Sequence, residues 1–248
     1  MSLQNILHVI AEGESRMKRI KIIFENKDLL VIDKPAGYLS HGDEKSKGSD
    51  VASWFAKNYP KSAKVGDDGR AGIVHRLDKD TSGVMLLAKT PEMFTYLKQS
   101  FETKDIEKTY LAITYGVVKD EQGMIDRPIG RSSHDARLRR TGADADGKQR
   151  NALTYYKVLE RFPQNTYLEV HPKSGRTHQV RVHLKSIGKP ILCDMLYAPG
   201  KACMPEMGRQ ALHASEITFA LPNGAKKSFK SPLPDDFKKT LEKLRKMC

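Results

Sequence analysis

The apolar positions of the chain form short runs that predict strands and helices in an irregular order. Runs at residues 21–24 and 29–32, separated by the polar turn 25–28, predict a β-hairpin. Helical spacing and capping residues predict helices at residues 51–59, 90–101, 177–187 and 235–247. Strands and helices do not alternate regularly, which favours a mixed α+β fold. The remaining strands are predicted at residues 84–88, 109–115, 152–160, 166–171 and 212–220.

We expect these elements to form one domain over residues 18–248. Residues 1–17 have a weak pattern and are expected to be an N-terminal tail. So short a segment is too small for an independent fold, so we expect no separate domain before the first strand.

The charge of the chain indicates a polyanionic partner. Forty-three Lys and Arg residues against thirty Asp and Glu residues give a formal net charge of +13. Such a surplus attracts phosphate-rich ligands and supplies salt-dependent contacts to them. A basic surface that only keeps the protein soluble is an equally good explanation of the charge alone.

The chain shows no sign of secretion or membrane insertion. Its apolar runs are far shorter than a membrane span, and the N-terminal apolar stretch at residues 6–10 has no basic region before it. We therefore expect a cytoplasmic protein. The cysteines are odd in number and widely spaced, which predicts neither a disulfide framework nor a zinc knuckle; they are Cys193, Cys203 and Cys248.

The segment with the strongest chemical signal is residues 75–83, His-Arg-Leu-Asp-Lys-Asp-Thr-Ser-Gly, followed by an apolar strand. It places Asp78 between basic residues in a polar loop that the strand holds in position. A carboxylate beside an arginine stays ionised and is available as a nucleophile or a base. Without further information, an aspartate that caps a turn beside a solvated salt bridge explains the same residues.

This segment resembles the signature of the RluA-type pseudouridine synthases, and other motifs of that family follow in the right order. The resemblance covers residues 20–232 and implies an RNA pseudouridine synthase that isomerises uridines in structured ribosomal or transfer RNA. It also implies a largely antiparallel central sheet, flanked by helices and loops, with an RNA-binding cleft. The other motifs lie at residues 32–41, 108–110, 174–183, 188–191 and 212–214.

The resemblance implies roles for four side chains. Asp78 is expected to attack the sugar or the uracil ring, or to remove a sugar proton, and the sequence does not choose among these. Arg176 is expected to pair with Asp78 and orient it, although a phosphate contact explains this residue nearly as well. Tyr110 is expected to stack on the uracil, with a half-buried strand aromatic as the alternative. Arg76 is expected to fill the gap that the target uridine leaves in its stack.

A basic segment at residues 127–150 is expected to be a solvated loop that clamps the RNA backbone. The partner is therefore expected to be RNA, with no DNA and no membrane, and the protein is expected to be a monomer. The RNA-binding residues predicted in this loop and elsewhere, besides Arg76, are His75, Arg131, Arg137, Arg139, Arg140 and His178.

No metal and no cofactor are expected. The histidines of the C-terminal half lack the spacing of a zinc site, and isomerisation of a glycosidic bond needs no redox equivalent or group donor. Two departures from the family pattern, Ser174 and Cys193-Asp194, are expected not to affect a catalytic role.

Two other functions remain open. A hydrolase could use Asp78 and Asp80 as paired carboxylates at a glycosidic bond. Alternatively, the chain could be an RNA-binding protein that keeps the fold without catalysis.

Overall fold

A nine-stranded sheet forms the centre of the computed structural model, which describes residues 19–42, 50–66, 70–142 and 145–247. The strand order is β1-β2-β3-β11-β4-β10-β9-β5, with β12 paired to β11. Only the β3–β11 pair is parallel, so the mixed and largely antiparallel sheet is confirmed. The strands are β1 (Lys21–Glu25), β2 (Leu29–Lys34), β3 (Ser82–Ala88), β4 (Glu107–Tyr115), β5 (Gln122–Asp126), β9 (Leu153–Arg161), β10 (Asn165–Pro172), β11 (Leu212–Ala220) and β12 (Lys226–Lys230).

The four predicted helices are confirmed with small shifts of their ends. They are α2 (Val51–Asn58), α3 (Pro91–Glu102), α4 (Gln179–Ser186) and α5 (Asp235–Arg245). The side chain of Thr90 caps α3 by accepting a hydrogen bond from the backbone of Met93, and Pro91 is the first helical residue, as the sequence predicts. Within the described ranges, no helix is long and apolar enough to cross a membrane. The predicted tail at residues 1–17 lies outside the described residues.

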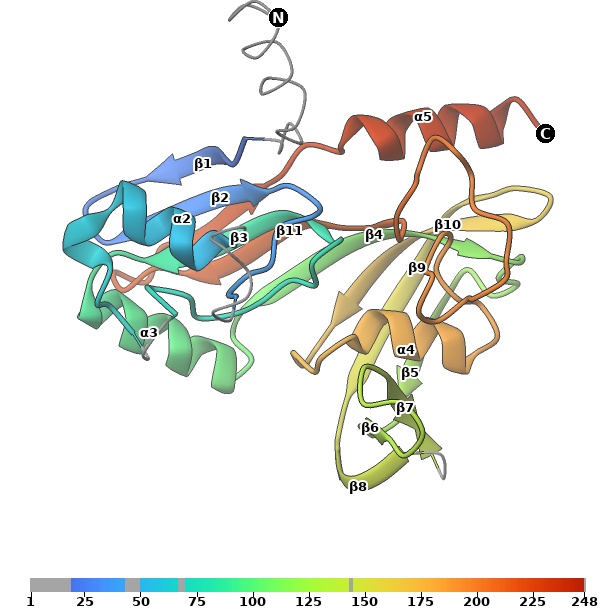
Figure 1. Ribbon diagram of the computed structural model, residues 1–248, viewed down its shortest axis with the longest axis horizontal. Coiled ribbons are helices and arrows are strands. Elements are labelled where there is room, and N and C mark those ends of the chain that lie inside the picture. Colours follow the sequence, from blue (N-terminus) through green and yellow to red (C-terminus); the bar gives the residue numbers. More distant parts are fainter. Residues whose placement is uncertain (1–18, 43–49, 67–69, 143–144, 248) are drawn as a thin grey trace, which may run out of the picture.

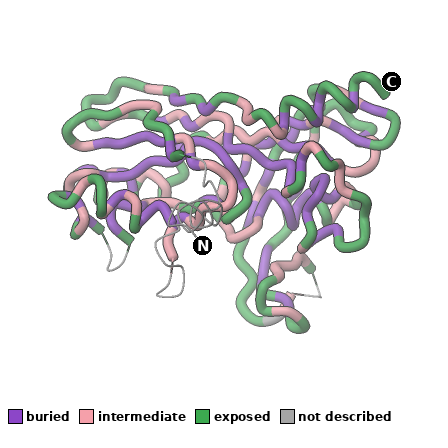
Figure 2. The backbone as a smooth tube through the Cα atoms, turned by 45° about the horizontal axis from the view of Figure 1, so that its top comes forward, coloured by how far each residue is buried: buried purple, intermediate pink, exposed green. Residues whose placement is uncertain are grey.

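The helices divide the molecule into two halves (Figure 1). In one half, α2 and α3 cover β2 and β3, and the two strands are buried along almost their whole length (Figure 2). Burial on both faces explains why residues 84–88 form a continuous apolar run instead of an alternating one. In the other half, α4 and α5 pack against β4, β9 and β10 around a second core.

The basic segment at residues 127–150 was expected to be a loop, and the structure corrects this. It forms a separate three-stranded antiparallel sheet of β6 (Ile129–Ser132), β7 (Arg139–Thr141) and β8 (Ala145–Arg150), here called the basic hairpin. Strands so rich in arginine lack the apolar alternation by which strands are recognised. The base of the basic hairpin packs on α4 through Ile129, Val182 and Tyr197, and the rest projects away from the central sheet (Figure 1).

The cysteines also differ from expectation, because Cys193 and Cys203 form a disulfide. Their Cα atoms lie 4.7 Å apart, although ten positions separate them in the sequence. The segment between them doubles back on itself, a path that spacing alone does not reveal. The bond closes one loop after α4.

The close approach of β3 and β11 gives a first prediction. Gly83 has φ +126°, and a Cβ at this position would collide with the carbonyl oxygen of Ala214 and lie 2.6 Å from its nitrogen. We expect Gly83→Ala to lower the free energy of unfolding by at least about 3 kcal/mol, because backbone strain and a backbone clash add. Urea denaturation measures this change.

The control is Gly224→Ala, since Gly224 also has a positive φ (+81°) but has open space around it. This variant should lose only about 1 kcal/mol, from strain alone. Equal losses in the two variants would contradict the importance of the β3–β11 contact.

Candidate active site

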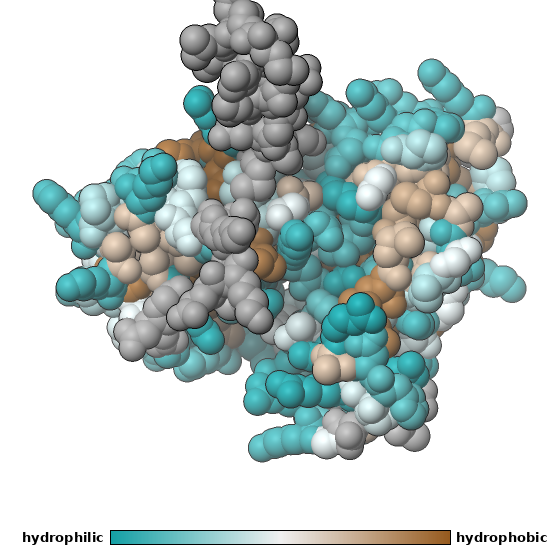
Figure 3. All heavy atoms as spheres, in the orientation of Figure 1, coloured by the Kyte–Doolittle hydropathy of each residue, from teal (hydrophilic) through white to brown (hydrophobic). Residues whose placement is uncertain are grey.

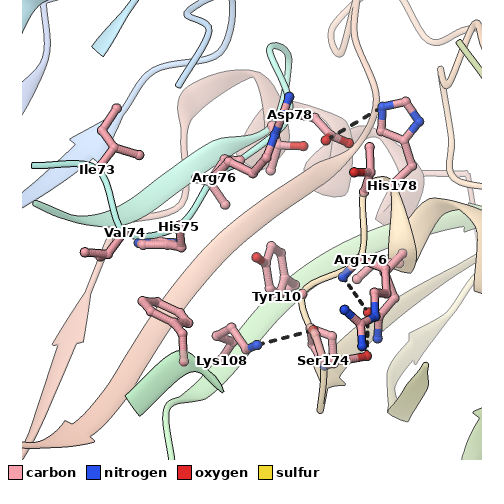
Figure 4. A pocket seen from close by; sticks show the side chains of 18 of the residues that line it. Ile73, Val74, His75, Arg76, Asp78, Lys108, Tyr110, Ser174, Arg176 and His178 are labelled. Carbon is pink, nitrogen blue, oxygen red and sulfur yellow. Dashed lines mark hydrogen bonds and ion pairs between the residues drawn. The ribbon is translucent and has the colours of Figure 1, made fainter. Parts of the chain in front are cut away.

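A cavity of about 590 Å³ lies between the two halves of the molecule. One wall comes from residues 70–81 and α3, and the other from Tyr110 and residues 172–181. The side chains of both walls point into it (Figure 4). Of the residues singled out from the sequence, it brings together His75, Arg76, Asp78, Tyr110, Arg176 and His178.

Asp78 is paired with an arginine, but not with the one expected. Its Oδ2 accepts a hydrogen bond of 3.0 Å from Nη1 of Arg181. The predicted pairing with Arg176 is therefore corrected: Nε of Arg176 donates to the carbonyl of Asn151, and its backbone nitrogen donates to Gln179. Arg176 still lines the same cavity, to the right of Tyr110 in Figure 4.

The signal that identifies Arg181 is its position on α4. It lies in the first turn of α4, three residues after the N-cap residue His178, and both side chains are directed at Asp78. Arg176 precedes the helix and lies in the turn before it. The helix begins between the two arginines of this motif, so Arg181 is directed at Asp78 and Arg176 is not.

Arg181 is also held by a second carboxylate. Its Nε and Nη2 donate to the two oxygens of Asp194 at 2.6 and 2.7 Å, a forked contact. Burial disfavours the charge, but Asp194 and then Asp78 more than offset this effect and raise the pKa of Arg181 above its ordinary value. The guanidinium therefore remains a fixed cation beside Asp78.

This contact changes the view of the Cys193-Asp194 pair, which was expected to have no catalytic consequence. Asp194 orients the partner of Asp78, so it belongs to the site. Cys193 has φ +59°, the left-handed region that favours glycine. The backbone conformation explains why glycine is common at this position in the family.

The loop that carries Asp78 is held by its backbone from the first motif. The hydroxyl of Ser40 donates to the carbonyl of Leu77 at 2.8 Å and accepts from its nitrogen at 2.9 Å. The ammonium of Lys34 is fully buried and donates to the carbonyl of Lys79 at 3.1 Å. Burial lowers the pKa of Lys34 to about 7. Neighbours on both sides of Asp78 are thereby fixed.

The C-terminal part of the chain holds the next residue of the loop. Nη1 of Arg209 donates to the carbonyl of Asp80 at 2.9 Å, while its other nitrogens donate to Asp236 on α5. Asp80 itself is exposed, and its side chain is not part of the cavity wall formed by the described residues. This placement argues against Asp80 as a second catalytic carboxylate.

Tyr110 and Lys108 occupy alternate positions of β4, and both side chains project into the cavity (Figure 4). Burial, and secondarily the charge of Asp78, raise the pKa of Tyr110 above its ordinary value, so the phenol stays protonated. Lys108 donates to the carbonyl of Ser174 at 3.3 Å. Burial, followed by the charge of Lys173, lowers the pKa of Lys108 to about 8. At neutral pH the cavity therefore contains a cation beside a neutral aromatic ring.

His75 is engaged inside the protein, although the sequence predicted an RNA contact. Its Nε2 accepts a hydrogen bond of 2.9 Å from the backbone of Leu86, and its ring stacks on Phe101 with centroids 4.7 Å apart. Burial, followed by the charge of Lys108, lowers the pKa of His75 to about 3. The neutral ring anchors the loop that carries Asp78 to β3 through Nε2, and an RNA contact by the rest of the ring stays a prediction.

Comparison with known proteins decides the family. Residues 28–186 match the model of a family described as RNA pseudouridylate synthase. The chain belongs to this family. It is 38% identical over 250 residues to ribosomal large subunit pseudouridine synthase D of Pseudomonas aeruginosa, covering 95% of this chain and 75% of that protein. The protein is thus an RNA pseudouridine synthase, and the resemblance noted in the sequence is confirmed.

Two further comparisons agree with this assignment. The synthase is 36% identical over 228 residues to the uncharacterised RNA pseudouridine synthase YlyB of Bacillus subtilis, covering 92% of this chain and 73% of that protein. It also superposes on human RNA pseudouridylate synthase domain containing 4 with a TM-score of 0.72, at 26% identity and 98% coverage of both chains. The fold expected from the sequence is therefore that of the family.

Apart from Arg76, which lines the cavity, the arginines predicted to bind RNA in the synthase lie on the basic hairpin, outside the cavity wall formed by the described residues. Arg131 is exposed, and Arg137 pairs with Asp135 at 2.8 Å on the surface. The guanidinium of Arg139 donates to two carbonyls of its own turn. Figure 3 shows hydrophilic side chains gathered over this projection.

The histidines that suggest a metal site in the sequence bond to separate groups of the synthase. Among the described residues, no three potential ligands gather at one point. His171 contacts Glu169, His178 contacts Tyr197, His183 contacts Thr154 and the carbonyl of Arg127, and His213 contacts Ser82 and the carbonyl of Ser231.

The two arginines of the motif give the second prediction. Arg181→Lys should slow the single-turnover rate at saturating RNA by about 10- to 100-fold, because one ammonium cannot bridge Asp194 and Asp78 and the catalytic carboxylate is held less firmly. Arg176→Lys should leave this rate within a few-fold. Rapid-quench assays with excess synthase measure both rates. A larger loss in the Arg176 variant would contradict the assignment of Arg181 as the partner of Asp78.

Proposed function

We propose that the synthase modifies a uridine of large-subunit ribosomal RNA and that Asp78 is its catalytic carboxylate. The observation that carries this proposal is the position of Asp78: it lines the cavity between the two halves while Arg181 holds its Oδ2. The other oxygen, Oδ1, lies 3.8 Å from Nε2 of His178. A carboxylate held by one oxygen in a cavity of nucleotide size suits attack on a bound nucleoside.

The cavity walls suit a uridine that has left its stack. Tyr110 offers an aromatic face for the uracil, and Arg76, exposed at the cavity, is placed to enter the gap in the RNA. Arg176 and Lys108 supply positive charge for the adjoining phosphates. We therefore assign Tyr110 to the base, Arg76 to the vacated stack and Arg176 to the backbone.

The reaction needs only groups of this kind. The bond from uracil N1 to the sugar breaks and a bond from C5 to the sugar forms; C5 loses a proton and N1 gains one, so the balance requires no oxidant, reductant or donor. Asp78 serves as the nucleophile or base that makes the glycosidic bond labile. Arg181 keeps the carboxylate oriented throughout.

The choice of ribosomal over transfer RNA rests on the relatives. The synthase of Pseudomonas aeruginosa named above carries the large ribosomal subunit in its name. A net charge of +13 and the basic hairpin suit a large folded RNA, whose shape rather than sequence is recognised. Because the described residues of one chain form both walls of the cavity, we propose that the synthase is a monomer. We also propose that it acts in the cytoplasm. Mapping pseudouridines in ribosomal and transfer RNA with and without the gene separates the two substrates.

The third prediction concerns the carboxylate. Asp78→Asn should lower turnover by at least about 100-fold, because the amide keeps the shape but is neither nucleophile nor base. RNA affinity should stay within a few-fold, since phosphate contacts supply most of it. Release of tritium from uracil C5 measures turnover, and filter binding measures affinity.

Asp80→Asn is the matched control, because it changes a neighbouring carboxylate outside the cavity wall of the described residues. It should retain turnover within a few-fold. Free uracil among the products would instead favour a hydrolase, and residual turnover of Asp78→Asn above about a hundredth of wild type would refute the catalytic role.

The fourth prediction concerns the basic hairpin, which we propose binds the RNA backbone. Replacing Arg137, Arg139 and Arg140 together by Gln should weaken RNA binding and flatten its salt dependence by up to about three phosphate contacts. The saturated rate should change little, because RNA at saturating concentration still occupies the basic hairpin. Affinity measured across a series of salt concentrations gives the slope.

A charge-matched control replaces Lys238, Lys239 and Lys246, exposed residues at α5, by Gln. Helix α5 lies at the opposite end of the molecule from the basic hairpin (Figure 1). This variant should keep most of the wild-type slope. Equal slopes for the two triple variants would show that only net charge matters and that the basic hairpin does not contact RNA.

A further inference from the structure

Tyr197 lies between the basic hairpin and the catalytic carboxylate. Its side chain is buried, and its hydroxyl accepts a hydrogen bond of 2.9 Å from the backbone nitrogen of Arg139. The same hydroxyl bonds Nδ1 of His178 at 2.8 Å. Its ring lies against the guanidinium of Arg181, 4.8 Å from the ring centroid, and edge-on to His178. Tyr197 therefore contacts both side chains that reach Asp78.

The hydrogen bonds of Tyr197 lead to an assignment of the proton on His178. We assign the single proton of the phenol to the bond with Nδ1 of a neutral imidazole, because Nδ1 is the acceptor that this hydroxyl contacts. Burial raises the pKa of Tyr197 to about 12 and lowers the pKa of His178, so both groups stay neutral near pH 7. The remaining proton of His178 is then on Nε2, the atom that faces Asp78.

His178 and Asp78 face each other but do not form a hydrogen bond. Nε2 lies 3.8 Å from Oδ1, beyond hydrogen-bond distance, and Figure 4 shows the ring directed at the carboxylate. A movement of roughly 1 Å would close it. His178 has φ +58° at the start of α4, so its side chain is set by a constrained backbone instead of a flexible loop. The orientation of the His178 ring is set from behind by the Tyr197 hydroxyl.

We propose that Tyr197 is a positioning residue that couples RNA docking on the basic hairpin to the catalytic carboxylate. The backbone N–H of Arg139 reports the position of the basic hairpin to the Tyr197 hydroxyl, which orients the His178 ring, whose Nε2–H then donates to Oδ1 of Asp78. With Arg181 on the other oxygen, both oxygens of the carboxylate become fixed when RNA is in place. This inference rests on the proposed roles of Asp78 and the basic hairpin.

Tyr197→Phe tests the role of the hydroxyl, because the ring and its packing on Arg181 are kept. We expect the single-turnover rate at saturating RNA to fall about ten-fold, the effect of one lost orienting hydrogen bond. RNA affinity and the unfolding midpoint should stay close to wild type. The matched control is Tyr96→Phe, which removes a tyrosine hydroxyl that bonds the carbonyl of Ala220 and should leave the rate unchanged.

A double-mutant cycle tests the route through His178. His178→Asn removes Nε2 while keeping a residue that tolerates a positive φ. If Tyr197 acts through His178, adding Tyr197→Phe to His178→Asn should cause no further loss of rate. Fully additive losses would overturn the relay, as would a Tyr197→Phe enzyme as fast as wild type.

Nitrogen NMR of the His178 ring separates this inference from the proposed function. In the wild-type protein the ring should be neutral with its proton on Nε2, RNA binding should shift the Nε2 signal, and Tyr197→Phe should abolish that preference and that shift. These signals without pseudouridine formation would refute the proposed function and leave the relay standing. A ring that Tyr197→Phe does not affect would overturn the relay even in an active enzyme.

Discussion

The burial of the Arg181 guanidinium is the constraint on which the active site depends. Its side chain is 6% exposed, and a buried ion costs several kcal/mol unless opposite charges and hydrogen bonds compensate it. Asp194 and Asp78 supply that compensation from two sides. Since Asp78 is 103 positions away in the sequence, the pair also ties the two halves of the molecule together across the cavity. Orientation of the Asp78 carboxylate and contact between the two halves of the fold thus depend on one interaction.

Asp78 is also fixed through the backbone of its neighbours, by side chains that do not all border the cavity. Lys34 and Arg209 donate hydrogen bonds to the backbone carbonyls of the two residues that follow Asp78. Arg209 is itself held by Asp236 of α5. Each of these side chains donates to several acceptors, so its geometry is determined. The C-terminal helix thereby helps to position the loop that carries Asp78, although none of its described residues lines the cavity. Such preorganisation is what a positioned nucleophile requires.

The fold and the central residue could be predicted from the sequence, while their partners depended on three-dimensional detail. The apolar runs and the capping signal at Thr90 located the main strands and helices, and the residues around Asp78 identified the family. The choice between Arg176 and Arg181 depended on the residue at which α4 begins. The basic hairpin lacks an apolar alternation, and the Cys193–Cys203 bond depends on the path of a loop. Local patterns carry no information about such contacts.

The turn at residues 194–197 contacts both side chains that are directed at Asp78, Arg181 and His178. Oδ1 of Asp194 accepts the backbone nitrogens of Leu196 and Tyr197 at 3.1 Å each, so the carboxylate that holds Arg181 also shapes the turn that carries Tyr197. Arg181, which Asp194 holds, donates to Oδ2 of Asp78. The Tyr197 hydroxyl bonds His178, whose Nε2 faces Oδ1 of Asp78. The basic hairpin rests on the same Tyr197. A displacement of the basic hairpin would reach this turn through the Tyr197 hydroxyl and would reach α4 directly through Ile129 and Val182. If the basic hairpin binds RNA and Asp78 is catalytic, as proposed, this turn and α4 are where the two functions would be coupled.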